Sequence, residues 1–209
     1  MNIKVCGITL LKQLQQLDGL DIDFAGLIFQ KDSPRYVGDK LSGKELKNAD
    51  FDLKTVGVFV DEDYDAIMRI VEEYGLDMVQ LHGKEEPELC EQLSAKVEVI
   101  KTYHVGATTE GMEEFIAFYD EVCDYYLFDT LVAGGLKGGT GKRFDWGLLK
   151  KQDIEKPFFL SGGIGLAEAA EIKKYKHPDF YAVDINSQFE KEPGVKDMAL
   201  VLQFRQALK

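Results

Sequence analysis

The sequence predicts an α/β protein folded as a single-domain (β/α)8 TIM barrel over residues 1–209, and two observations lead to this prediction. Eight short apolar runs, each bounded by turn residues, alternate with eight segments of helical periodicity. Strands that alternate with helices form a parallel sheet through right-handed crossovers. Eight such units close a barrel, and 209 residues lies at the short end of the range of about 200 to over 400 residues for this fold. A doubly wound sheet with fewer strands is the structural alternative.

The strands are predicted where β-branched, aromatic and small apolar residues run together. The run at 55–60 is apolar at nearly every position, as expected for a strand that is covered on both faces. Strands of this kind are predicted at 3–6, 24–29, 55–60, 78–81, 97–101, 125–128, 157–160 and 180–184.

The helices are predicted from apolar residues three or four positions apart and from capping residues. Leu10, Leu14 and Leu17 share one face of the first helix, which Thr9 is predicted to cap. Asp61 and Asp145 are N-cap candidates for two later helices. Helical segments are predicted at 10–18, around 42–48, after Asp61, and around 85–93, 111–122, 145–151, 166–175 and 196–208.

The charge and cysteine content argue against several kinds of partner and site. The net charge of −12 argues against general binding to nucleic acid or to an anionic membrane, although a local pocket can still bind a phosphorylated small molecule. Cys6, Cys90 and Cys123 have no metal-type spacing, and the chain has only three histidines. We therefore expect reduced thiols in a cytoplasmic protein, without a metal.

We expect neither a signal peptide nor a membrane segment, because a strand already begins at residue 3 and no apolar run is long enough to span a bilayer. The acidic composition favours solubility and leaves both a monomer and a homodimer open.

Residues that carry chemistry follow the predicted strands at their carboxyl ends. In a barrel these ends open on one face, where enzymes of this fold hold their active sites. The residues at or just after the strand ends are Cys6, Arg35, His82, Lys101 or Tyr103, Asp129, Ser161 and Asp184. Residues far apart in the sequence are therefore predicted to share one rim.

Each of these residues also has an ordinary structural role open to it. Cys6 can be a small core residue, and His82 can be a hydrogen-bonded residue at a strand end. Arg35 follows a proline and offers a planar fork to a carboxylate, but a loop arginine is often only solvated. Asp184 can be a cap or a loop acceptor. Lys4 lies within a strand, and a lysine that faces into a barrel needs an anionic partner.

Two glycine-rich segments are candidates for binding an anion, most simply a phosphate. Gly162 and Gly163 precede a predicted helix, so backbone N–H groups near a helix N-terminus can approach a ligand closely. The segment 134–141 contains five glycines, and Gly139 and Gly141 can add donors from the neighbouring unit. A tight turn and a solvated loop are the alternatives.

A set of short motifs runs through nearly the whole chain in a fixed order. They lie at 4–9, 33–35, 56–59, 79–83, 128–129, 138–141, 144–146, 160–163 and 183–184, followed by Glu190, Gly194, Lys196 and Asp197. In this order and spacing the motifs resemble the phosphoribosylanthranilate isomerase family of tryptophan biosynthesis. The resemblance implies a (β/α)8 barrel that needs no cofactor or metal, and an Amadori rearrangement of N-(5-phosphoribosyl)anthranilate to 1-(2-carboxyphenylamino)-1-deoxyribulose 5-phosphate.

The resemblance also implies a role for each matching residue. The position of Asp129 is that of the general acid, which protonates the ring oxygen of the sugar, and the position of Cys6 is that of the general base, which removes the C2 proton. Arg35 matches the arginine that holds the anthranilate carboxylate, and His82 and Asp184 are further substrate-binding candidates. The phosphate-binding candidates are Gly139, Gly141, Gly162, Gly163, Asn186 and Ser187.

The general acid and base need different protonation states. A free thiol titrates near ~8.5, so only a few per cent is thiolate at neutral pH, whereas an aspartate with a reference pKa of ~3.9 must hold a proton to act as an acid. Burial or a nearby anion would raise the pKa of Asp129.

One segment departs from the family pattern. After the last strand the family has Asp-x-Ser-Ser-Gly-x-Glu, whereas here Asn186 replaces the first serine and Gln188 replaces the glycine. Glutamine does not readily take a positive φ. We therefore expect a phosphate loop of different shape, or side-chain donors from Asn186 and Gln188.

Two other functions remain open from the sequence. The related phosphosugar isomerase of histidine biosynthesis has an aspartate at the end of the first strand, and Cys6 stands there in this chain. A non-catalytic barrel that binds a phosphorylated ligand would not need the pair of Cys6 and Asp129.

Overall fold

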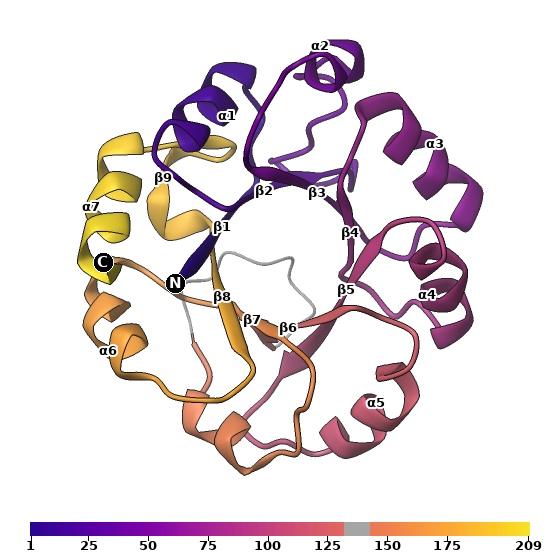
Figure 1. Ribbon diagram of the computed structural model, residues 1–209, viewed down its shortest axis with the longest axis vertical. Coiled ribbons are helices and arrows are strands. Elements are labelled where there is room, and N and C mark those ends of the chain that lie inside the picture. The colour runs from indigo at the N-terminus through magenta and orange to yellow at the C-terminus, as the bar shows by residue number, and fades with distance from the viewer. Residues whose placement is uncertain (132–142) are drawn as a thin grey trace.

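The computed structural model describes residues 1–131 and 143–209 and confirms the predicted fold class. Eight strands form a closed barrel in which each strand pairs in parallel with its neighbours and β1 pairs with β8 (Figure 1). The strands are β1 (Asn2–Cys6), β2 (Phe24–Ile28), β3 (Lys54–Phe59), β4 (Met78–Leu81), β5 (Glu98–Val105), β6 (Tyr125–Thr130), β7 (Phe158–Leu160) and β8 (Phe180–Ile185).

The helices form an outer ring around the barrel (Figure 1). They are α1 (Leu11–Asp18), α2 (Gly43–Lys47), α3 (Tyr64–Tyr74), α4 (Pro87–Ser94), α5 (Met112–Tyr119), α6 (Ala169–Lys174) and α7 (Met198–Leu208), with 3-10 turns η1 (Trp146–Lys151), η2 (Leu166–Glu168) and η3 (Ser187–Phe189). The segment predicted as a helix at 145–151 is therefore a 3-10 helix, although Asp145 caps it as predicted through its bond from the Gly147 N–H.

Two predicted helix caps are wrong. Thr9 does not cap α1, because its hydroxyl donates to the Gly194 carbonyl at 2.7 Å instead. Asp63, not Asp61, caps α3 by accepting from the Ala66 N–H. Asp61 lies in a turn with φ +51°, where its carboxylate accepts from the Lys84 N–H.

A small hairpin that the sequence pattern did not predict follows η3. It consists of β9 (Glu190–Glu192) and β10 (Val195–Lys196), which pair antiparallel. The hairpin lies between the end of β8 and the start of α7, beside α1 (Figure 1).

Alternating side chains divide the molecule into two apolar layers. Inside the barrel, one layer of side chains packs together: Phe24, Val56, Met78, Ile100, Leu127, Phe159 and Ala182. A larger layer lies between the outer faces of the strands and the helices. The residues that follow the inner layer along each strand form the carboxyl-terminal mouth. None of the helices in the described residues is long and apolar enough to cross a membrane.

Candidate active site

The carboxyl ends of β1, β4, β6 and β8 bring four of the predicted residues to one mouth. Cys6 ends β1, His82 follows β4, Asp129 lies in β6 and Asp184 in β8. His82 Nε2 lies 3.7 Å from Asp129 Oδ2. The predicted clustering of these side chains is therefore seen, while their roles stay predictions.

Cys6 lies against a glycine of the neighbouring strand. A Cβ placed on Gly26 would lie 2.8 Å from Cys6 Sγ, so the missing side chain leaves room for the thiol. The thiol is buried, and burial raises the pKa of Cys6, although the Lys4 ammonium opposes this shift. Near neutral pH and without a ligand, Cys6 is thus mainly a protonated thiol.

Lys4 and Asp184 form a buried ion pair below Cys6 in the barrel interior. Lys4 Nζ lies 3.0 Å from Asp184 Oδ1, and the two residues are partners in the register of β1 and β8. This is the anionic partner that an inward-facing lysine needs. Burial raises the pKa of Asp184, and Lys4 works against that shift. Asp184 Oδ2 also accepts from the Ser161 hydroxyl at 3.4 Å.

Asp129 lies in an environment that favours the protonated form of its carboxyl group. Burial raises the pKa of Asp129, while His104 and the hydrogen bond from the Thr130 N–H partly oppose this shift. The Thr130 N–H donates to Oδ1 at 2.8 Å. A raised pKa is the property that a general acid near neutral pH requires.

His82 is neutral near neutral pH. Burial, with a smaller contribution from His104, lowers the pKa of His82 to about 3. Its Nδ1 lies 3.0 Å from the Gln80 amide and 3.2 Å from the Thr102 hydroxyl, so these groups orient the ring. The neutral ring can therefore act as a hydrogen-bonding group toward Asp129, but not as a cation.

His82, His104 and Asp129 are the residues in the described part of the chain that come nearest to a metal-binding group. One ligand atom from each lies within 4.8 Å of the others. His104 Nε2 contacts the His82 carbonyl at 3.1 Å and must donate to it, so this nitrogen already has a partner. We interpret His82 and His104 as a pair of rings, joined through the His82 carbonyl, that lies beside Asp129.

Arg35 is held by a carboxylate of the protein. Its guanidinium makes a bidentate contact with Glu190, with Nη2 to Oε2 at 2.7 Å and Nε to Oε1 at 2.9 Å. Lys196 Nζ contacts the same Glu190 at 2.7 Å. Burial works to raise the pKa of Glu190, but its bonds from Arg35 and Lys196 hold that pKa below the usual value. The arginine is thus oriented before any ligand binds.

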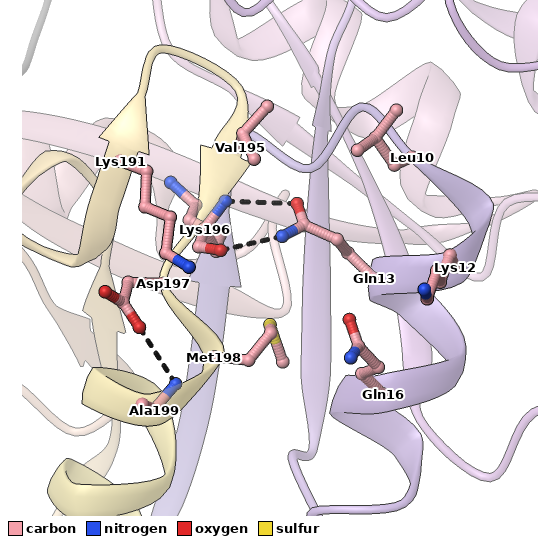
Figure 2. Close-up of a pocket in the computed structure, with 10 residues that line it drawn as sticks. All are labelled: Leu10, Lys12, Gln13, Gln16, Lys191, Val195, Lys196, Asp197, Met198 and Ala199. Atoms are coloured by element: carbon pink, nitrogen blue, oxygen red, sulfur yellow. Dashed lines mark hydrogen bonds between the residues drawn. The ribbon is translucent and has the colours of Figure 1, made fainter.

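The hairpin that carries Lys196 is fixed to α1 by a side-chain amide. Gln13 donates to the Lys196 carbonyl at 2.8 Å and accepts from the Lys196 N–H at 3.1 Å (Figure 2). Figure 2 shows this pair at a hollow between α1 and the hairpin. No predicted site residue in the described part of the chain lines this hollow, which lies outside the mouth.

The loop after β7 approaches Asp129 closely. Gly162 has φ +90° and Gly163 has φ +65°, a conformation that favours glycine. A Cβ on Gly162 would lie 2.8 Å from the Thr130 nitrogen and 2.9 Å from Asp129 Oδ1. These two glycines therefore bring the loop backbone beside the candidate acid; their role in phosphate binding stays a prediction.

The loop after β8 carries Gln188 in a 3-10 turn. Ser187 and Gln188 lie in η3, so Gln188 avoids a positive φ, and its side chain is exposed. Asn186 Oδ1 accepts from Lys196 Nζ at 2.7 Å, which leaves the amide NH2 as the group that Asn186 can offer a ligand. Gly139 and Gly141, the other phosphate candidates, lie outside the described residues.

The two strand-five candidates point away from the mouth. Lys101 Nζ binds Glu85 Oε2 at 2.6 Å and the Gly83 carbonyl at 3.0 Å, and the Tyr103 hydroxyl donates to the Glu110 carbonyl. Their predicted place at the rim is wrong, because strand alternation directs odd-numbered residues of β5 outward.

Residues that the sequence analysis did not assign to the site also contribute to it. Lys196 and Glu190 stood only within motifs, and His104 and Gln80 were not singled out. Strand alternation gave a signal for Gln80, because it lies two positions before the candidate His82. The sequence pattern gave no direction for His104, since it does not fix which residues of β5 face inward. No local signal connected Glu190 to Arg35, which is 155 positions away.

The chain is similar to known proteins over nearly its whole length. The model of the N-(5'phosphoribosyl)anthranilate (PRA) isomerase family matches residues 3–207. The chain belongs to the N-(5'-phosphoribosyl)anthranilate isomerase family. This is a family of isomerases in tryptophan biosynthesis, as the sequence motifs indicated.

Individual relatives cover almost the full length. The N-(5'-phosphoribosyl)anthranilate isomerase of Parabacteroides distasonis is 39% identical, with 100% of this chain and 93% of the relative covered. That of Phocaeicola vulgatus is 36% identical, with 100% and 98% covered. The crystal structure of phosphoribosyl anthranilate isomerase from Thermotoga maritima superposes with a TM-score of 0.86 at 30% identity, covering 100% of this chain and 98% of that one.

A further crystal structure holds a ligand. It is a phosphoribosyl anthranilate isomerase in complex with reduced 1-(o-carboxyphenylamino)-1-deoxyribulose 5-phosphate, and it superposes with a TM-score of 0.81 at 29% identity over 100% of this chain and 98% of that one.

Proposed function

We propose that this chain catalyses the Amadori rearrangement of N-(5'-phosphoribosyl)anthranilate to 1-(2-carboxyphenylamino)-1-deoxyribulose 5-phosphate. The observation that carries the proposal is the placement of Cys6 and Asp129 at one barrel mouth, in a chain of this isomerase family. A related enzyme binds a reduced form of this product.

In the proposed reaction Asp129 is the general acid. Its protonated carboxyl group donates to the ring oxygen of the ribose, and the ring opens to a Schiff base with the anthranilate nitrogen. The raised pKa of Asp129 supports this role, because the group then carries a proton at a pH where most aspartates do not. Neutral His82 beside it can accept or donate a hydrogen bond without supplying a competing charge.

Cys6 is the proposed general base. Its thiolate removes the proton from C2 of the Schiff base, and the resulting enolamine tautomerises to the ketone. Because the pKa of Cys6 is raised, the thiolate is a minor form near neutral pH. Since Asp129 must keep its proton while Cys6 loses one, we expect a bell-shaped dependence of turnover on pH.

Binding groups surround this pair. Arg35, oriented by Glu190, is proposed to hold the anthranilate carboxylate, and Asp184 to accept from a ribose hydroxyl. Backbone N–H groups near Gly162, Gly163 and Ser187 are proposed to hold the phosphate, with Gly139, Gly141 and the Asn186 amide as further donors. We propose a cytoplasmic enzyme, since all three cysteines are free, that acts without metal or cofactor as a monomer or homodimer.

A turnover assay tests the proposal. N-(5'-phosphoribosyl)anthranilate is generated in situ from anthranilate and phosphoribosyl pyrophosphate by the transferase, and its fluorescence is followed after the purified protein is added. We expect loss well above the spontaneous background. A folded protein that leaves the background unchanged would overturn the proposal, and the histidine-pathway substrate would then be assayed next.

A further inference from the structure

We propose that Lys4 is a positioning residue for the reaction: its buried ammonium, fixed by Asp184, stabilises the thiolate form of Cys6. The catalytic part of this inference rests on the proposed function of Cys6. The effect of Lys4 on the thiol itself does not, and it can be measured without substrate.

The strand geometry places the ammonium beside the thiol. Lys4 and Cys6 are two positions apart on β1, so both side chains point into the barrel. Lys4 is fully buried, its Nζ lies 3.0 Å from Asp184 Oδ1, and it shares the interior face of β1 with the Cys6 thiol. Gly26 bounds the thiol on the neighbouring strand β2, where any Cβ would lie 2.8 Å from Sγ. The ammonium and the sulfur therefore lie in the same interior space, and the ammonium acts on the charge of the thiol.

The hydrogen-bonding capacity of Lys4 leaves a donor for the sulfur. An ammonium has three N–H groups, and Asp184 uses one of them. Asp184 is held from its other oxygen by Ser161, so the carboxylate fixes the direction of the ammonium. A buried pair of charges of this kind adds little stability over an apolar pair of the same size, which favours a functional reason for keeping it.

Lys196 is the other cation close to Cys6, and its donors are occupied. Its Nζ bonds to the Asn186 carbonyl at 3.2 Å, to Asn186 Oδ1 at 2.7 Å and to Glu190 Oε1 at 2.7 Å. Arg35 is likewise engaged by Glu190. Of the two cations that act on the charge of Cys6, Lys4 and Lys196, Lys4 is therefore the one that retains a free donor in the described part of the chain.

The electrostatic balance around Cys6 gives the direction of the effect. Burial raises the pKa of Cys6, Lys4 and then Lys196 oppose that shift, and Asp184 adds to it. Asp129 and Asp184 face the same interior space, and His82 there is neutral. Removal of the ammonium should therefore raise the thiol pKa further, whereas removal of the Asp184 charge should lower it.

The test measures the rate of Cys6 alkylation by iodoacetamide as a function of pH, with the modified peptide identified by mass spectrometry. The variants are Lys4→Met and Asp184→Asn. We expect the alkylation midpoint to move up by at least one pH unit in Lys4→Met, with a rate at pH 8 at least tenfold below that of the unaltered protein. Asp184→Asn should move the midpoint down. If the ion pair of Lys4 and Asp184 had only a structural role, the alkylation midpoints of both variants would move in the same direction.

A second comparison covers the case in which Lys4→Met does not fold because Asp184 is left unpaired. Lys4→Met/Asp184→Asn removes both charges, and its comparison with Asp184→Asn isolates the ammonium. We expect at least tenfold slower alkylation at pH 8 in the double variant than in Asp184→Asn, and equal rates would overturn the proposal. Lys101→Met is the matched control, since it removes a buried lysine outside the mouth and should leave the midpoint unchanged.

Measuring turnover alongside alkylation distinguishes a failure of this inference from a failure of the proposed function. If the unaltered protein is active, the alkaline limb of its bell-shaped kcat profile should move upward in Lys4→Met together with the alkylation midpoint. An active protein whose alkylation profile is unaffected by Lys4→Met refutes the inference alone. An inactive protein with a shifted alkylation profile refutes the proposed function alone.

Discussion

Gly26 leaves the space that the Cys6 sulfur occupies. We expect Gly26→Ala to lower kcat by at least tenfold, because the new methyl group would lie 2.8 Å from Sγ and must displace it. Gly57→Ala on the adjacent strand is the control, since its methyl group would meet Leu76 and Phe59 rather than the thiol. Steady-state kinetics and urea unfolding of both variants check this. Equal turnover of Gly26→Ala and the unaltered protein would contradict the account.

The neutral state of His82 has a consequence for acid stability. With a folded-state pKa of about 3 and an unfolded pKa of 6.5, His82 binds more protons in the unfolded chain throughout that interval. Its contribution to stability is complete above pH 6.5 and falls as the pH is lowered toward 3, with a slope of at most about 1.4 kcal/mol per pH unit.

We expect His82→Gln to lose less stability than the unaltered protein between pH 6.5 and pH 4. Urea unfolding at several pH values measures this. The contribution of His177, whose pKa burial also lowers, is present in both proteins and cancels. Parallel stability curves would show that His82 is not held neutral by burial.

At the scale of elements, the β9–β10 hairpin connects Arg35 to the barrel. Glu190→Gln keeps the size of the side chain but leaves Lys196 without its carboxylate, and such a change typically costs about 3–5 kcal/mol. We expect reduced stability at neutral pH and a raised KM, because Arg35 loses its bidentate partner. Unfolding and steady-state kinetics measure both effects.

The pH dependence of that loss provides its check. The folded-state pKa of Glu190 is lowered, so its contribution is present above the unfolded value of 4.5 and is lost as the pH falls through the folded value. The difference in stability between the unaltered protein and Glu190→Gln should therefore shrink in acid. A difference independent of pH would mean that the ion pairs of Glu190 do not stabilise the hairpin.

Element prediction succeeded where the sequence pattern is repeated and failed where a contact is distant. The eight strands are visible as apolar runs because both faces of each are buried. Asp61 and Asp63 are both residue types that commonly cap helices. The folded chain brings the Lys84 N–H to the Asp61 carboxylate, so Asp63 caps α3 instead, and the sequence pattern does not show this. The hairpin is short and polar, and it is held by Gln13, which lies 183 positions from Lys196 in the chain. The periodicity of apolar residues in the sequence does not indicate a contact between positions so far apart.

At the scale of the whole molecule, stability and chemistry lie in different layers. Ile172 is fully buried between α6 and the barrel. We expect Ile172→Ala to lower the free energy of unfolding by about 2–5 kcal/mol and to leave kcat of the folded protein unchanged. Thermal or urea unfolding and kinetics below the transition measure the two quantities. A loss of kcat equal to that of Gly26→Ala would mean that the outer layer also determines the geometry of the mouth.

The sequence predicted which side chains stand at the strand ends better than it predicted which side chains they contact. Because all strand ends of a barrel share one face, Cys6, Asp129 and Asp184 could be placed together from sequence alone. Lys101 was misplaced because its inward or outward direction depends on strand register, which the pattern at 97–101 does not fix. The internal carboxylate that engages Arg35 required the folded chain.

The measurement that tests the central claim most directly is turnover of N-(5'-phosphoribosyl)anthranilate by the unaltered protein, Cys6→Ala, Asp129→Asn and Cys90→Ala side by side. Cys90→Ala removes a buried thiol outside the mouth. The account predicts activity in the unaltered protein and in Cys90→Ala, and a loss of at least 100-fold in the other two, since general acid–base groups contribute about 10²–10⁴-fold. Near-normal turnover in folded Cys6→Ala or Asp129→Asn would contradict it.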